Sequence, residues 1–190
     1  MIFTGQASPL TGAPGAVLLY GVLAVLAWPR RDASFAGSEI QRRPARIVWA
    51  VLWVGMAGLW VLPANRGAGS ISSALTNAAS GEPGWLSHLD LGLAHAANGR
   101  GTVLAVVLAS ASVAIGVGPL VSRRPHRWLV GGAALSLVFW VTGEALGGML
   151  TGLGTDPNAA PLVILLGLTA CPLSVGLPAL HRRAPTAVPA

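Results

Sequence analysis

Five long apolar stretches, almost free of charge, follow one another along this chain of 190 residues. A helix needs about 20 predominantly apolar residues to cross the hydrocarbon layer of a bilayer. Unpaired backbone groups in lipid cost several kcal/mol each, so such segments must be helical. The pattern predicts an all-α, polytopic membrane helix bundle that forms one membrane domain over 1–190. The five predicted transmembrane helices cover about 10–28, 47–63, 101–121, 128–150 and 161–180.

The arginines predict how the chain is threaded through the membrane. The chain has 12 arginines and no lysine. Ten of them lie between the first and second runs, between the third and fourth runs, and after the fifth. The other links hold only Arg66 and Arg100. Short arginine-rich loops remain in the cytoplasm, so the N-terminus is predicted outside and the C-terminus inside.

Composition limits the class of protein. Apolar residues make up 53% of the chain and charged residues 9%, against about 25% charged in soluble domains. The net charge of +6 lies mostly at the ends of apolar runs, where it meets lipid headgroups. No aromatic and basic platform accompanies it, so nucleic acid is excluded as a partner and the lipid bilayer is expected instead.

The link over 64–100 is predicted to lie outside and to contain an interfacial amphipathic helix. A turn cluster over 80–84 divides it. After the turn, three leucines recur at helical spacing and share one face: Leu86, Leu89 and Leu93. Three other residues of this helix are predicted to point elsewhere: Ser87, Asp90 and Ala94. Such a helix lies flat on the outer leaflet or caps the bundle.

Glu144 is the only acidic residue inside a predicted span. An intramembrane carboxylate marks a path or site for a proton, cation or ligand. The alternative is structural, because small residues spaced along a helix allow close backbone approach. The glycines that would form such contacts are Gly143, Gly147, Gly148 and Gly152. Both interpretations remain open.

Other candidate site residues are fewer and weaker. Asp156 fits the first position of a turn and Asn158 can cap the next helix, and both could join Glu144 in a ligand or ion site. His88 and His95 are weak metal candidates, because they lie seven positions apart and pairs of ligands on a helix normally lie four apart. No catalytic arrangement, metal motif or cofactor motif is legible.

The stretch from Trp140 to Leu162 carries a resemblance. It reads tryptophan, Gly-Glu, Gly-Gly, Thr-Gly, then Thr-Asp-Pro-Asn and Pro-Leu. This pattern resembles a group of uncharacterised integral membrane proteins of high-GC Gram-positive bacteria, in which Gly-Gln sometimes replaces Gly-Glu. The resemblance covers 47–168 and implies a bacterial cytoplasmic (inner) membrane location, multi-pass, with no specific activity. An occasional glutamine argues against an obligatory titrating carboxylate at position 144.

Together these features favour a non-enzymatic membrane component. It would be a subunit or accessory factor, contacting other membrane subunits or a second copy of itself, or a small-ligand-binding protein. Two alternatives remain open. One is a small transporter or permease that uses the Glu144 carboxylate, and the other is a membrane enzyme with an outer-face site.

Overall fold

The computed structural model describes residues 20–25, 39–143, 146 and 159–170. Residues 20–25 are helical. The remaining helices are α2 (Glu39–Trp60), α3 (Pro63–Arg66), α4 (Ser70–Ala79), α5 (Gly84–Ala97), α6 (Gly101–Val121), α7 (Pro125–Thr142) and α8 (Ala159–Ala170). Every regular element within these residues is a helix, which confirms the all-α prediction.

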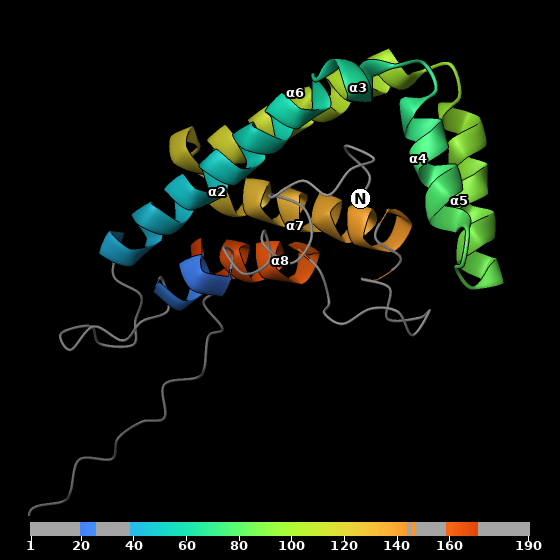
Figure 1. Cartoon of the computed structure of the whole chain (residues 1–190). Coiled ribbons are helices and arrows are strands. Elements are labelled where there is room, and N and C mark those ends of the chain that lie inside the picture. Colours follow the sequence, from blue (N-terminus) through green and yellow to red (C-terminus); the bar gives the residue numbers. More distant parts are fainter. Residues whose placement is uncertain (1–19, 26–38, 144–145, 147–158, 171–190) are drawn as a thin grey trace, which may run out of the picture.

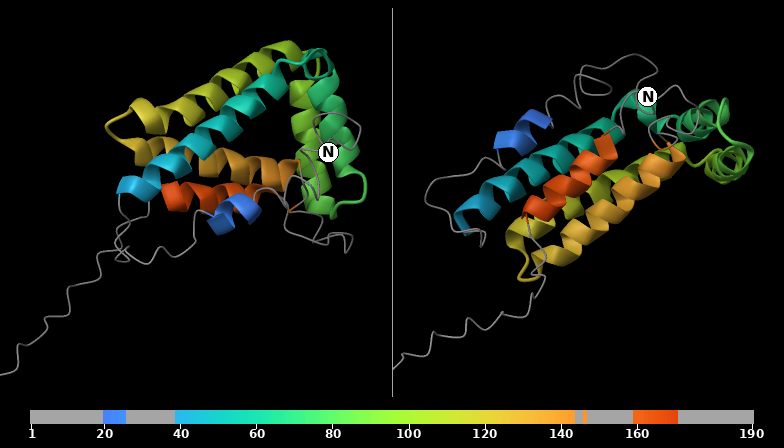
Figure 2. Two further views of the ribbon diagram at one scale, coloured as in Figure 1. Left: turned by 60° about the vertical axis from the view of Figure 1, so that its left-hand side comes forward. Right: turned by 90° about the horizontal axis from the view of Figure 1, so that it is seen from below.

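Four helices form a bundle around a common core. Helix α2 lies beside α6, α6 beside α7, α7 beside α8, and α8 beside α2, which closes the ring. Helices α4 and α5 form a hairpin that crosses one end of this bundle (Figure 1). The view from below shows the hairpin almost end-on, beyond the ends of the bundle helices (Figure 2). The start of α2 and the α6–α7 link lie at the opposite end (Figure 1).

Two tryptophans of α2 form the centre of the bundle. Trp49 and Trp53 are 0% exposed, and their ring centroids are 5.6 Å apart. The indole Nε1 of Trp49 donates a 3.0 Å hydrogen bond to the carbonyl of Ile115. Pro119 lies four residues after Ile115 in α6 and has no N–H, so that carbonyl lacks its helical donor. The indole N–H of Trp49 therefore replaces the backbone donor that Pro119 removes from α6.

Glycines allow the neighbouring helices to approach these indoles. A methyl group at Gly132 of α7 would collide with the Trp49 ring, and one at Gly167 of α8 would lie 3.1 Å from it. A Cβ at Gly116 of α6 would lie 3.0 Å from the Cβ of Trp53. Close approach at glycines therefore occurs in three different helices, whereas Gly147, Gly148 and Gly152, for which the sequence predicted such contacts, lie outside the described residues.

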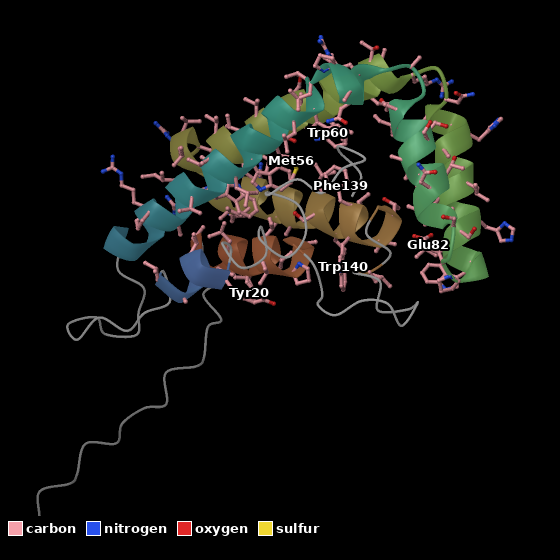
Figure 3. All side chains as sticks on the ribbon, viewed as in Figure 1. Tyr20, Met56, Trp60, Glu82, Phe139 and Trp140 are labelled. Atoms are coloured by element: carbon pink, nitrogen blue, oxygen red, sulfur yellow. The ribbon has the colours of Figure 1, made fainter. Side chains whose placement is uncertain are left out.

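A second apolar cluster lies nearer the hairpin. Trp60 of α2 and Phe139 of α7 have ring centroids 5.8 Å apart, and Met56 packs against the same cluster. Figure 3 shows these three side chains pointing into the space between the two helices. Ile71 of α4 also packs here, so the cluster joins the hairpin to the bundle.

Helix α6 has two contrasting faces. Its buried side consists mostly of small residues: Gly101, Ala105, Ala109, Ser112, Gly116 and Gly118. Its outward side carries large apolar residues: Val103, Val106, Val107, Val113, Val117, Leu120 and Val121. In its most apolar stretch of 18 residues the mean hydropathy reaches 2.2, and 39% of that stretch is buried. Among the described residues it is the one helix long and apolar enough to cross a membrane.

The helix boundaries differ in part from the predicted spans. Helix α6 coincides with 101–121, but α2 begins at Glu39 and ends at Trp60, and α7 ends at Thr142. The length and composition of the described helices therefore do not support five spans, because only one of these helices is long and apolar enough to cross a membrane. Charged residues in the first turns of α2 and α7 lower the hydropathy of these helices. Most of 10–28 and the second half of 161–180 lie outside the described residues.

Candidate functional site

The α4–α5 hairpin is fixed to the bundle at its two ends. Before α4, Asn65 is buried and its Nδ2 donates a 2.8 Å hydrogen bond to the Leu59 carbonyl of α2. After α5, the Thr102 hydroxyl donates a 2.8 Å bond to the Arg66 carbonyl, and the Gly101 N–H donates to the chain at Ala68. The first turn of α6 is thereby joined to α3.

Two glycines with positive φ shape the turns around α5. Gly81 has a φ of +98° in the α4–α5 turn, and Gly99 has a φ of +74° between α5 and α6. Side chains with a Cβ adopt this region at a cost, so glycine suits both positions. Pro83 then precedes α5, and its carbonyl accepts the N–H groups of Leu86 and Ser87. The predicted turn at 80–84 and the helix after it are both confirmed.

The buried residues of α5 recur every three or four positions: Leu86, Asp90, Ala94 and Ala97. The sequence predicted that Leu86, Leu89 and Leu93 share a face that lies on the outer leaflet or caps the bundle. Leu89 and Leu93 are 43% and 39% exposed, so this face does not pack on the bundle, and Asp90 and Ala94, predicted to point away from it, are the buried residues. Helix α5 packs chiefly against α4 and also touches α7. The pairing with α4 is a tertiary contact, and it turns Asp90 inward.

Asp90 is the most unusual side chain of the hairpin. It is 0% exposed, and neither carboxylate oxygen accepts a hydrogen bond. Burial raises its pKa from 3.8 to about 6. An ionised carboxylate without water or a donor is costly, so the group is driven to bind a proton or another positive charge.

Glu82 is the second acid of this site. It lies in the turn between α4 and α5 (Figure 3), and both of its carboxylate oxygens are buried without a hydrogen-bond partner. Its pKa is raised by burial and further by the negative charge of Asp90. The two carboxylates therefore share an electrostatic environment that favours an added positive charge. We refer to Glu82 and Asp90 as the acidic pair.

Among the described residues, the helices that pack against α5 offer the acidic pair no compensating charge. Helix α4 contains no titratable side chain, and the titratable residues of α7, His126 and Arg127, lie in its first turn at the far end of the bundle. His88 and His95 of α5 are exposed. Within the described part of the chain, no group of three or more histidine, cysteine, aspartate or glutamate side chains could hold a metal ion.

Most of the site residues expected from the sequence lie outside the described residues. These are Glu144, Asp156, Asn158, Gly147, Gly148 and Gly152. Gly143 is described and is buried at the C-terminal cap of α7, where its N–H donates to Phe139. The predicted ligand site at the end of the fourth span therefore stays a prediction. The acidic pair was missed, although a lone aspartate among leucines and alanines of α5 was its signal in the sequence.

Comparison of the chain with family models, with curated proteins and with solved structures gives no match.

Proposed function

We propose that this chain is a multi-pass protein of the bacterial cytoplasmic membrane, a non-enzymatic accessory or ligand-binding component with the α4–α5 hairpin on the outer side. The observation that carries the proposal is the sidedness of α6, whose small residues face the bundle while its valines face outward. Apolar surface left in water costs about 25 cal/mol per Å2, whereas lipid tails cover it without that cost. A surface helix of a soluble protein would instead bury its large apolar residues and expose polar ones.

The other bundle helices support the same interpretation. Their outward faces carry further exposed apolar residues: Val51 and Val54 on α2, Val130, Leu137 and Val138 on α7, and Leu165 and Leu168 on α8. Helix α6 has 21 residues and is about as long as the 30 Å hydrocarbon layer is thick, whereas α2 has 22 residues of which the first turns carry arginines that would lie at the headgroups. Five spans remain our proposal for the full topology, with the first over 10–28.

The distribution of arginine supports the orientation. The first turns of α2 carry Arg43 and Arg46, and the α6–α7 link carries Arg123 and Arg124. These segments lie at the end of the bundle opposite the hairpin (Figure 1). Because arginine-rich ends stay on the cytoplasmic side, the hairpin would face the exterior. The buried acidic pair would then lie on the outer side of the membrane, and its two unpaired carboxylates favour a cationic ligand, with a proton as the simplest one.

Cysteine labelling with a membrane-impermeant maleimide tests this orientation. In a Cys171→Ser background, Ser80→Cys at the hairpin and His126→Cys at the start of α7 both change exposed positions. We expect Ser80→Cys to react in intact cells and His126→Cys to react only after permeabilisation. If only His126→Cys reacts in intact cells, the orientation in the membrane is the reverse of the one proposed. Release of the protein by alkaline carbonate would refute membrane insertion.

The accessory role requires a surface for a partner or a second copy. Trp85 is 59% exposed on α5, next to Leu89, and gives the hairpin an apolar outer stripe. Purification in mild detergent should retain a partner or a homo-oligomer, and Trp85→Ser should reduce that retention. Ser87→Ala, on another side of the same helix, is the matched control. A monodisperse monomer at all detergent concentrations would contradict the accessory role.

A further inference from the structure

An open groove lies at the arginine-rich end of the bundle, between α6 and α7. Its volume is about 640 Å3. The lining residues that matter here are Ile115, Arg123, Arg124, Arg127, Trp128 and Gly131. Cationic side chains and apolar surface thus line the same groove.

Trp128 and Gly131 of α7 form the apolar part of the groove: Trp128 packs tightly against α6, and Gly131 leaves open space. The Trp128 indole lies so close to Gly118 that a methyl group there would collide with it. Trp128 is still 37% exposed, so one part of the ring is left to line the groove. A Cβ added at Gly131 would meet no atom within 4 Å. The floor of the groove at Gly131 is therefore open, and an apolar chain could lie there.

The cationic part comes from the short link between two helices. Residues 122–124 join α6 to α7, and the link is held by a 3.1 Å hydrogen bond from the Arg124 N–H to the Ser122 hydroxyl. Arg123 and Arg124 precede α7, and Arg127 lies in its first turn. All three are exposed.

These arginines lack carboxylate partners among the side chains that the structure describes. The acids whose side chains the structure describes, Glu82 and Asp90, belong to the hairpin at the opposite end. Three guanidinium groups and the positive end of the α7 dipole therefore face the same region, and no described carboxylate side chain compensates them. Guanidinium groups bind phosphate through parallel N–H donors, which makes the pair both charge-assisted and geometrically specific.

We propose that this groove binds an anionic phospholipid, with Arg123, Arg124 and Arg127 on its phosphate and an acyl chain beside Trp128 and Gly131. The inference rests on the proposed membrane location. A free phosphate would use only the arginines, whereas a phospholipid uses the cationic rim and the apolar floor together. The exposed Val121 and Val130 continue the apolar surface on both helices. Basic pockets between membrane helices on the cytoplasmic side bind anionic headgroups in the same way.

Native mass spectrometry of the full chain with added lipid tests the proposal. We expect the wild-type protein to retain phosphatidylglycerol over phosphatidylcholine. Arg124→Gln and Arg127→Gln should each lower the affinity about fivefold, since one basic residue near the surface contributes about that factor. Arg66→Gln, an exposed arginine at the hairpin end, is the matched control and should have no effect. Equal retention of both lipids, or equal loss with Arg66→Gln, would overturn the proposal.

Two further variants separate the groove from general charge effects. Gly131→Leu fills the open floor without changing charge, and we expect it to lower phosphatidylglycerol retention at least threefold. Arg124→Lys keeps the charge and loses the planar fork, so it should fall between wild type and Arg124→Gln. Unchanged retention by Gly131→Leu would refute the groove as the site.

The source of the phosphate is tested by competition. Glycerol phosphate and inorganic phosphate should not displace the lipid at millimolar concentration. If either displaces it, the arginines bind free phosphate and the phospholipid proposal is wrong. The cysteine labelling described above is independent of lipid binding. Failure of the lipid-binding experiment alone would refute the phospholipid site, whereas failure of the labelling experiment would refute the proposed orientation in the membrane.

Discussion

Replacing Asp90 with asparagine should stabilise the α4–α5 hairpin at neutral pH and have little effect in acid. The side chain is 0% exposed and accepts no hydrogen bond, so its charge is not compensated. Asparagine has nearly the same shape and no charge. The change therefore removes the cost of the buried charge while leaving the packing of α5 against α4 in place.

The size and sign of the effect follow from the raised pKa. Burial raises the pKa of Asp90 from 3.8 to about 6, so the closed hairpin binds a proton more tightly than the open one. Hairpin stability is then highest below pH 3.8, falls as the pH rises towards 6, and is constant above that. At about 1.4 kcal/mol for each pKa unit, the loss is roughly 3 kcal/mol. Glu82, whose pKa is also raised, acts in the same direction.

Hydrogen–deuterium exchange of the α4–α5 peptides in nanodiscs measures this stability. Comparing variant and wild type at each pH cancels the intrinsic exchange rate. At pH 7.5 we expect Asp90→Asn to raise the protection of the hairpin about a hundredfold, and at pH 4 we expect the difference to shrink to about threefold. His88→Gln, exposed on the same helix, is the control and should leave protection unchanged. Equal protection of wild type and Asp90→Asn at pH 7.5 would refute the claim that an uncompensated charge on Asp90 destabilises the hairpin.

Two further predictions concern the core of the bundle. Gly132→Ala should destabilise the bundle by about 1–3 kcal/mol, because the methyl group collides with Trp49. The neighbouring Gly131→Ala meets open space and should not destabilise it. Thermal unfolding in detergent compares the two variants, and equal melting temperatures would contradict the packing of Gly132 against Trp49. Trp49→Phe should cost about 1 kcal/mol less in a Pro119→Ala background, because an alanine N–H can then bond to Ile115. A double-mutant cycle measures that coupling, and its absence would show that the indole does not replace the missing donor.

The sequence predicted α6 well because nothing interrupts its apolar run. Arg100 precedes the helix and Ser122 follows it, so the boundaries of hydropathy and of the helix coincide. Helix α2 was predicted too short because its first turns carry arginines and Pro44, which read as a link. Charged residues can continue a helix beyond the apolar segment, and hydropathy does not register this. The helical fold class follows from composition, but helix ends in charged segments do not.

The acidic pair could not be predicted for a different reason. Periodicity within α5 identified the leucine face, but the partner of the other face is α4, which is weakly patterned. Helix–helix pairing therefore determined the burial of Asp90, and no feature local to α5 encodes it. The same holds for Gly132, whose neighbour Gly131 looks equivalent in the sequence and lies in open space.

Stability is unevenly distributed between the two ends of the molecule. Towards the arginine-rich end, Trp49 is held by a hydrogen bond to α6 and by glycine contacts with α7 and α8, so three helices constrain one side chain. At the hairpin end, the buried Asp90 carboxylate opposes closure unless it is neutralised. A proton or cation that binds the acidic pair would therefore change the hairpin and leave the bundle intact, because local opening occurs where the free energy is lowest. We accordingly expect ligand-dependent changes in exchange to be confined to α4 and α5, and equal changes in α6 and α7 would contradict this view.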